Sequence, residues 1–170
     1  MRPALIVMGA AGAGKSRIGS ALAVVLGVPF VEGDAFHPAE NITLMAAGVP
    51  LDDANRHGWL LALAHELRHA REASHGIVMA CSALTRRYRD MLRRGDDTVR
   101  FVFLATCADV LRSRLASRQG HFMPASLIDS QLAALEPPDI DERAWTFDAS
   151  DEPDALVADV LRHLQKCAHA

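Results

Sequence analysis

The stretch Gly9-Ala10-Ala11-Gly12-Ala13-Gly14-Lys15-Ser16 matches the phosphate-binding pattern G-x-x-x-x-G-K-[ST]. The apolar run Ala4–Met8 precedes it, and an amphipathic helical pattern comes after it and stops at Gly27. Glycines let such a loop curl so that its backbone N–H groups point at phosphate oxygens, and the helix start adds a positive dipole end. The sequence therefore predicts ATP or GTP binding, with Lys15 on the β- and γ-phosphates and the Ser16 hydroxyl on Mg²⁺.

Short apolar runs alternate with helical patterns along the rest of the chain. Such alternation predicts an α/β fold of three layers around a mostly parallel sheet. The chain has 170 residues, so we expect a single domain over residues 1–170. The predicted strands are Ala4–Met8, Val28–Val31, Ile77–Ala80, Arg100–Leu104 and Ala144–Phe147; the predicted helices are Lys15–Leu26, Trp59–Ser74, Thr85–Arg94, Ala108–Gln119, Pro124–Leu135 and Pro153–Cys167.

Composition limits the classes of partner. The formal net charge is −3, whereas duplex-binding proteins usually have a basic excess, so nucleic acid is not expected as the main partner. Cys81, Cys107 and Cys167 are widely spaced, which argues against a disulfide scaffold or a thiolate zinc site. The apolar run Ala4–Met8 is too short for a signal peptide or a membrane span. We therefore expect a cytoplasmic protein with no membrane partner.

The residues that come directly after the predicted strands indicate how the nucleotide is used. GTPase switches need an N-K-x-D tetrapeptide, which the sequence lacks, and the chain runs from Ile77–Ala80 into Cys81-Ser82-Ala83 rather than into a metal-binding aspartate. Asp34 comes after the second strand, where side chains of parallel sheets line the ligand crevice. There a carboxylate can deprotonate an acceptor hydroxyl or hold Mg²⁺ through water; capping a short helix is the structural alternative. Glu32 is expected to face elsewhere. These features favour a compact kinase for a small acceptor.

Motifs after the phosphate loop form a family signature over residues 5–150. They are Gly33-Asp34-Ala35-Phe36-His37-Pro38-Ala39-Glu40-Asn41, the segment Met45 to Leu51, Arg56, Trp59-Leu60, Cys81-Ser82-Ala83-Leu84, Tyr88-Arg89-Asp90, the segment Arg114 to Phe122, Ser130-Gln131 and Leu135-Glu136-Pro137. Together they resemble the gluconate kinase (gluconokinase) family of P-loop small-molecule kinases. The resemblance implies transfer of the γ-phosphoryl group of ATP to the 6-hydroxyl of D-gluconate. It also implies a five-stranded parallel core, a helical lid over the nucleotide and a homodimer.

The acceptor site is expected to combine an arginine with polar groups, because gluconate has one carboxylate and several hydroxyls. Arg56 precedes a predicted helix and suits the carboxylate, unless it forms an ion pair with Asp52 or Asp53. His121 either contacts substrate or holds the lid. For the others the alternatives are helix capping, helix bracing or plain surface positions. The residues expected to bind substrate are Asp34, His37, Asn41, Arg56, Ser82, Arg89 and His121.

A lid is expected over about residues 112–125. Arg114 and Arg118 are four residues apart on one helix face, and two guanidinium groups there would neutralise charge on the triphosphate and exclude water. A surface pair braced by Asp109 is the alternative. Ser150 comes after the last predicted strand and is expected to flank the adenine or to cap a helix. The expected catalytic residues are thus Lys15, Asp34, Arg114 and Arg118, and the nucleotide is bound by the phosphate loop with Arg114 and Ser150.

The chain departs from the family pattern at four positions on the acceptor side. Leu44 and Thr85 stand where the family has lysines, Asn55 replaces an aspartate and Gly58 replaces a proline. The phosphate loop, Asp34 and the lid motif are complete. A kinase for another small hydroxy acid, such as a related aldonate or shikimate, is the alternative to a gluconate kinase. An ATP-binding regulatory module is a further alternative, but it would need neither Asp34 nor the lid arginines.

Overall fold

The computed structural model describes residues 2–117 and 125–168 and contains one five-stranded parallel sheet. The strand order is β2-β3-β1-β4-β5, so β1, which leads into the phosphate loop, is central. The predicted α/β class with its five parallel strands is confirmed. The strands are β1 (Ala4–Met8), β2 (Phe30–Glu32), β3 (Ile77–Ala80), β4 (Arg100–Ala105) and β5 (Ala144–Asp148).

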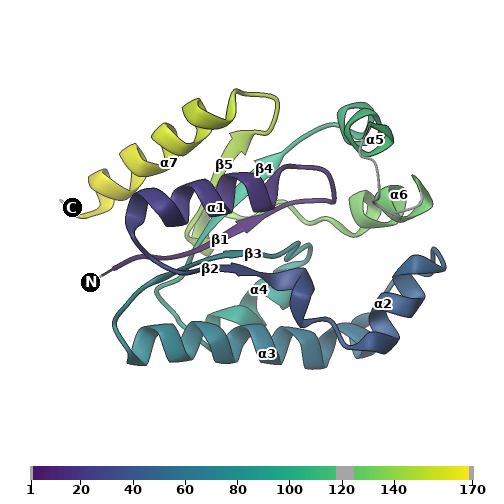
Figure 1. The fold of residues 1–170 in the computed structure, drawn as a ribbon, viewed down its shortest axis with the longest axis horizontal. Coiled ribbons are helices and arrows are strands. Elements are labelled where there is room, and N and C mark those ends of the chain that lie inside the picture. The colour runs from purple at the N-terminus through teal and green to yellow at the C-terminus, as the bar shows by residue number, and fades with distance from the viewer. Residues whose placement is uncertain (1, 118–124, 169–170) are drawn as a thin grey trace.

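Helices cover both faces of the sheet, as Figure 1 shows. α1 (Lys15–Leu26) and α7 (Pro153–Ala168) lie on one face, and α3 (Asp53–Glu72) and α4 (Arg86–Arg93) lie on the other. Three shorter helices gather at the end of the molecule opposite the N and C labels: α2 (Ala39–Ala46), α5 (Ala108–Ala116) and α6 (Ala125–Ala134). Two 3₁₀ turns, η1 (Gly33–Phe36) and η2 (Ile140–Glu142), complete the described elements.

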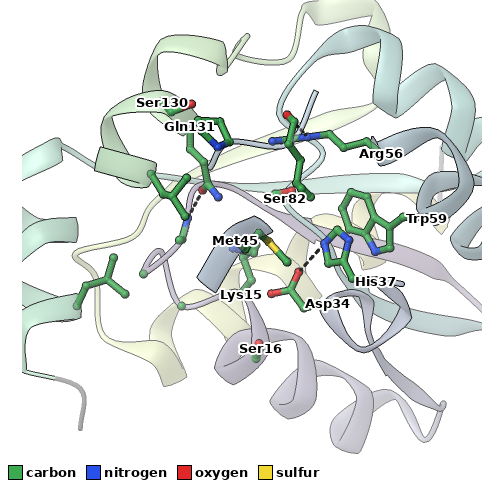
Figure 2. Close-up of a pocket in the computed structure, with 17 residues that line it drawn as sticks. Lys15, Ser16, Asp34, His37, Met45, Arg56, Trp59, Ser82, Ser130 and Gln131 are labelled. Carbon is green, nitrogen blue, oxygen red and sulfur yellow. Dashed lines mark hydrogen bonds and ion pairs between the residues drawn. The ribbon is translucent and has the colours of Figure 1, made fainter. Parts of the chain in front are cut away.

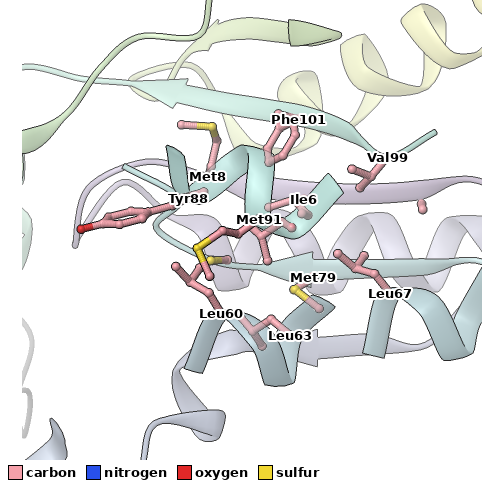
Figure 3. Close-up of a cluster of buried hydrophobic side chains, with 14 of the residues drawn as sticks. Ile6, Met8, Leu60, Leu63, Leu67, Met79, Tyr88, Met91, Val99 and Phe101 are labelled. Carbon is pink, nitrogen blue, oxygen red and sulfur yellow. The ribbon is translucent and has the colours of Figure 1, made fainter. Parts of the chain in front are cut away.

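The hydrophobic core lies in two layers separated by the sheet. Alternate residues of β1 point to opposite faces: Ile6 and Met8 pack with α3 and α4, whereas Leu5 and Val7 pack with α1 and α7. Figure 3 shows the first of these layers, in which Ile6 and Met8 meet Phe101 of β4. A parallel strand buried on both faces is apolar at every position, which is why the continuous apolar run Ala4–Met8 predicted a strand of a parallel sheet.

Several element ends differ from the sequence prediction, and two elements, α3 and β2, begin more than one residue away from the predicted start. α3 begins at Asp53 and not at Trp59, because Asp52 and Asn55 form a capping box: the Asn55 N–H donates to Asp52 Oδ1 (2.8 Å) and the Asp52 N–H donates to Asn55 Oδ1 (3.2 Å). β2 begins at Phe30 and not at Val28. The Val28 N–H donates to the carbonyl of Ala23 at the end of α1, and Pro29 has no N–H to pair.

Within the described residues, no helix combines the length and the apolar character that crossing a membrane would require.

Candidate active site

A pocket lies at the carboxyl ends of the strands, beside the phosphate loop. Several elements contribute to it: the phosphate loop itself, η1, the first turns of α3, the turn after β3, and α6. Figure 2 shows Lys15, Asp34 and Arg56 arranged around it. The lining residues include Ala11, Gly12, Lys15, Ser16, Asp34, His37, Arg56, Trp59, Ser82 and Gln131.

The phosphate loop depends on glycine at both of its ends. Gly9 has a φ of 141°, and a Cβ there would lie 2.9 Å from the carbonyl oxygen of Leu104. Gly14 caps α1 with a φ of 97°, so the first turn of that helix opens toward the pocket. Lys15 donates from Nζ to the carbonyl oxygen of Ala10 (3.0 Å), which holds the ammonium group over its own loop. The loop therefore has the backbone geometry and the cation that a phosphate site requires.

Glu32 faces the phosphate loop, and the expectation that it faces elsewhere was wrong. The hydroxyl of Ser16 donates a hydrogen bond to the Glu32 carboxylate. Phe30, two residues earlier on the same face of β2, packs against Gly19 of α1, so Glu32 meets the first turn of that helix. A hydroxyl and a carboxylate oxygen at this place are hard donors of the kind that Mg²⁺ prefers.

Asp34 lies in a turn that a hydrogen bond from Trp59 holds in place. The indole Nε1 of Trp59 donates to the carbonyl oxygen of Gly33 (2.7 Å), and a Cβ on Gly33 would collide with the carbonyl oxygen of Ala80. The chain therefore turns tightly over β3 and presents Asp34 to the pocket with 67% of its side chain exposed. The 3₁₀ turn η1, within which Asp34 lies, therefore determines the position of this carboxylate.

His37 lies between Asp34 and the indole of Trp59. Its ring stacks on Trp59 with centroids 4.2 Å apart, and its Nε2 lies 4.0 Å from Asp34 Oδ1. Burial lowers the pKa of His37; the carboxylate of Asp34 opposes that shift and the charge of Arg56 adds to it. The imidazole is therefore neutral near pH 7. Asn41 Nδ2 lies 3.3 Å from His37 Nδ1, and an amide N–H there leaves the ring proton on Nε2, facing Asp34.

Asn41 is a buried bracing residue and not a pocket-lining one. Its side chain also donates to the carbonyl oxygen of Asn55 (2.8 Å), and the residue is 2% exposed. It thus ties α2 to the start of α3 and orients His37. The predicted substrate contact of Asn41 is replaced by this indirect role.

Arg56 points into the pocket from the first turns of α3, inside the helix and not before it as expected. Its Nε donates to the carbonyl oxygen of Leu51 (3.2 Å), and its guanidinium carbon lies 5.4 Å from the centre of the Tyr88 ring. The two aspartates that could have paired with it are used elsewhere. Asp52 caps α3, and Asp53 accepts hydrogen bonds from Arg87 and from the Tyr88 hydroxyl. The arginine is thus held by neutral partners beside the pocket.

Ser82 lines the pocket at the end of β3, and Arg89 holds the turn beneath it. The Ser82 carbonyl accepts from the Gly9 N–H (3.3 Å), which joins this turn to the phosphate loop. Arg89 is fully buried: it pairs with Glu142 (2.6 and 2.8 Å) and donates from Nη1 to the carbonyl oxygen of Ala83 (3.1 Å). This burial corrects the prediction that Arg89 binds substrate, because its guanidinium group faces Glu142 and backbone carbonyls.

A second pocket adjoins the far side of the phosphate loop. Its lining includes Gly14, Arg17, Arg114 and Ser150. Arg114 bridges two carbonyl oxygens, those of Gly12 (3.4 Å) and Ala149 (2.5 Å), and so connects the phosphate loop to the turn after β5. Ser150 donates from N and Oγ to Asp148 (2.8 and 2.7 Å), and these bonds lower the pKa of the Asp148 carboxyl. The predicted nucleotide residues Arg114 and Ser150 therefore meet in one pocket.

Two predicted residues, Arg118 and His121, lie outside the described residues. The structure adds pocket residues to which the sequence assigned no role, above all Gln131 of α6 and Leu127 one turn earlier. The motif Ser130-Gln131 was the available signal for the first of these.

Comparison with known proteins points to one family. The shikimate kinase family profile matches residues 11–164. A gluconokinase of Gluconobacter oxydans is 47% identical over 95% of this chain and 90% of its own length. The crystal structure of a gluconokinase from Sinorhizobium meliloti superposes with a TM-score of 0.89 at 41% identity, over 99% of this chain and 94% of that one. An unliganded sugar kinase from a Janibacter species superposes with a TM-score of 0.93 at 41% identity, over 97% and 95%.

Proposed function

Because the chain belongs to the gluconokinases, within the shikimate kinase family of P-loop proteins, we propose that it transfers the γ-phosphoryl group of ATP to the 6-hydroxyl of D-gluconate. The observation that supports this best is the placement of Asp34 and Arg56 in one pocket with Lys15 of the phosphate loop. A sugar acid has a carboxylate at one end and a hydroxyl at the other. The pocket offers a cation for the first and a base for the second.

The transfer step assigns a separate task to each of these side chains. The 6-hydroxyl oxygen attacks the γ-phosphorus, its proton passes to the Asp34 carboxylate, and the bond from the γ-phosphorus to the bridging oxygen breaks to release ADP. Lys15 neutralises charge on the phosphates. Arg56 pairs with the gluconate carboxylate and so sets which hydroxyl reaches the phosphorus. The Nε2 atom of neutral His37 lies 4.0 Å from Asp34 Oδ1, and its N–H places a positive dipole end beside that carboxylate.

Magnesium fits the phosphate side of the pocket. Mg²⁺ binds few protein oxygens and takes the rest of its shell from phosphates and water. We assign the Ser16 hydroxyl as its direct protein ligand and the Glu32 carboxylate as the partner of a metal-bound water. When bound, the ion would neutralise charge on the β- and γ-phosphates.

The four departures from the family pattern do not touch the acceptor directly. Leu44, Asn55, Gly58 and Thr85 are absent from the described residues that line the pocket. Asn55 completes the cap of α3, and Thr85 caps α4 by accepting from the Tyr88 N–H (3.3 Å). Asn55 and Thr85 therefore act on helix ends, Leu44 and Gly58 lie within α2 and α3, and the pocket residues Asp34, His37, Arg56 and Ser82 match the family pattern. This favours gluconate over a related aldonate or shikimate.

Three further expectations stay predictions. A lid over about residues 112–125 would close above the nucleotide, with Arg114 and Arg118 on the phosphates. The homodimer rests on the family resemblance alone. A cytoplasmic location agrees with three free cysteines.

The test is a coupled assay of ADP release across acceptors, with the phosphorylated product identified by ³¹P NMR and mass spectrometry. Gluconate should give the highest kcat/KM among gluconate, epimeric aldonates and shikimate, by roughly tenfold or more, since misplacing the carboxylate or hydroxyl costs at least one charge-assisted hydrogen bond. A higher kcat/KM for shikimate or another aldonate would overturn the assignment of the acceptor. ATP turnover that is independent of every acceptor would overturn the kinase assignment.

A further inference from the structure

Gln131 is a pocket residue that the proposed chemistry leaves without a task. It lies on α6, one turn after Leu127 and Ile128, which are 4% and 1% exposed. Ile128 packs into the core layer shared with α1 and α7, and this fixes the rotation of α6 about its axis. Gln131 is consequently held with its half-buried side chain toward the pocket and not toward solvent.

The amide oxygen of Gln131 binds the phosphate loop. The Ala11 N–H donates to Gln131 Oε1 at 2.8 Å, a bond that spans 120 positions of sequence and that Figure 2 shows as a dashed line. Backbone N–H groups of such loops normally serve phosphate oxygens. Here a neutral amide takes one of them. With Oε1 engaged, the Nε2 end of the same planar amide, which can only donate, is the part left to meet a ligand.

Two pockets adjoin the phosphate loop, and the one that Gln131 lines indicates which ligand its amide can meet. Ala11 and Gln131 line the pocket that contains Asp34, Arg56 and Ser82. The adjoining pocket, with Arg17, Arg114 and Ser150, is lined by the later part of the loop from Gly12 to Gly14 and by neither Ala11 nor Gln131. The amide of Gln131 thus faces the pocket that contains Asp34 and Arg56, and not the adjoining pocket of Arg114 and Ser150.

We propose that Gln131 is a specificity-determining residue for the acceptor: Oε1 anchors the side chain on the Ala11 N–H, and Nε2 donates a hydrogen bond to an oxygen of the sugar acid held between Asp34 and Arg56. This inference rests on the proposed function, since it adds a contact to that same site. A donor suits either a carboxylate or a hydroxyl oxygen of gluconate, and both are abundant on this acceptor. The anchor to the phosphate loop sets the distance between that contact and the transferring phosphoryl group.

Two substitutions of Gln131 separate the anchor, the bond from the Ala11 N–H to Oε1, from the donor, the Nε2 group. Gln131→Ala removes both the anchor and the donor. Gln131→Glu keeps an oxygen that can accept from the Ala11 N–H, but it removes the donor and places a negative charge beside an anionic acceptor. The matched control is Asp129→Asn on the same helix, an exposed residue that pairs with Arg112 at 2.5 Å and does not line the pocket.

The experiment measures acceptor KM, kcat and ATP dissociation constant for the wild type and the three variants. Gln131→Ala should raise the KM for gluconate about tenfold, the value of one hydrogen bond to a charged or polar ligand, while the ATP dissociation constant changes less than about twofold. Gln131→Glu should raise the KM at least as much although its anchor remains. Asp129→Asn should match the wild type in the KM for gluconate and in the ATP dissociation constant.

Two results would contradict the acceptor role of Gln131. A wild-type KM in Gln131→Glu would show that only the anchor matters and would overturn the inference. A change confined to ATP binding in Gln131→Ala would overturn it in favour of a nucleotide role. The acceptor compared is whichever one the wild-type protein phosphorylates best. Failure of gluconate in the wild type therefore counts against the proposed function, whereas unchanged acceptor KM values in the variants count against Gln131 alone.

Discussion

The carboxylate of Asp34 combines exposure to the pocket with a fixed position. Its side chain is 67% exposed, yet the turn that supports it is held by the bond from Trp59 Nε1 to the Gly33 carbonyl. A base must be accessible to the hydroxyl and rigid relative to the phosphorus. His37, stacked on the same indole, adds a polar hydrogen on the side facing the carboxylate.

Asp34→Asn tests the base directly, because it keeps the size of the side chain and removes its charge. We expect kcat to fall by roughly 10²–10⁴, the range for loss of a general base, with the ATP dissociation constant nearly unchanged. Steady-state kinetics and titration calorimetry measure the two quantities. Glu40→Gln, at an exposed position on α2, is the charge-matched control. Loss of ATP binding with kcat preserved would instead make Asp34 a metal or nucleotide residue.

Substitutions at Arg56 should distinguish binding of the gluconate carboxylate by positive charge alone from binding by the planar guanidinium group. Arg56→Lys keeps the charge but loses the planar fork, so the KM for gluconate should rise about tenfold or more, and Arg56→Ala should raise it further. The kcat at saturating gluconate should change less than the KM. Arg87→Lys, 71% exposed and paired with Asp53, serves as the control. An unaffected KM in Arg56→Ala would place the acceptor carboxylate elsewhere.

Between elements, an ion pair buried on both sides joins α4 to η2. Arg89 and Glu142 are 0% and 2% exposed, and Arg93 adds a second cation to the same carboxylate. Burial by itself raises the pKa of Glu142, but the hydrogen bonds from Arg89 and from the Asp139 N–H, with the charges of Arg89 and Arg93, lower it to about 2. Because Arg89 also holds the Ala83 carbonyl, this pair supports the turn that presents Ser82.

The lowered pKa of Glu142 predicts an acid-dependent loss of stability. The unfolded chain binds a proton at this group near its ordinary pKa of 4.5, and the folded chain does so only near 2. The contribution is therefore complete above about pH 5 and is lost as the pH falls toward 2. In urea titrations, Glu142→Gln should lower the free energy of unfolding at pH 7 by about 3 kcal/mol and flatten its decline below pH 5. Asp90→Asn, which breaks the exposed pair with Arg93, should leave that slope in place. Identical slopes for Glu142→Gln and wild type would contradict the assignment.

Most helices and strands could be predicted from the sequence, but the partners of individual side chains could not. The five strands and α1 were predicted because burial on both faces, or on one helical stripe, leaves a periodic apolar pattern. The direction of Glu32 depends on which face of β2 receives α1, a fact of tertiary packing. The burial of Arg89 depends on Glu142, 53 positions away in the sequence. Without knowledge of that partner, a basic residue on an amphipathic helix is predicted to be exposed. Likewise, no local pattern places Gln131 on the Ala11 N–H.

For the molecule as a whole, the three free thiols should divide into two classes. Cys81 lies in the core at the end of β3, and burial raises its pKa to about 12, whereas Cys107 and Cys167 are exposed. Thiolate is the reactive form, so two thiols should react quickly with Ellman's reagent in the native protein and the third only on unfolding. The double variant Cys107→Ser/Cys167→Ser should show no fast phase. Three equal rates in the native protein would contradict the burial of Cys81.

The segment that connects β2 to β3 has a consequence for how such an enzyme diversifies. It supplies Asp34, His37 and Arg56 to the acceptor pocket, whereas the second pocket is lined by residues within 12–18, 114–117 and 149–156. Within it, α2 buries only Asn41 among its described residues, so little of the hydrophobic core depends on that helix. Substitutions at Met45 and Pro50, which line the pocket, should therefore change its wall while the sheet and the phosphate loop keep their packing. We therefore expect acceptor preference to change through this segment while the site that binds the phosphoryl donor stays the same.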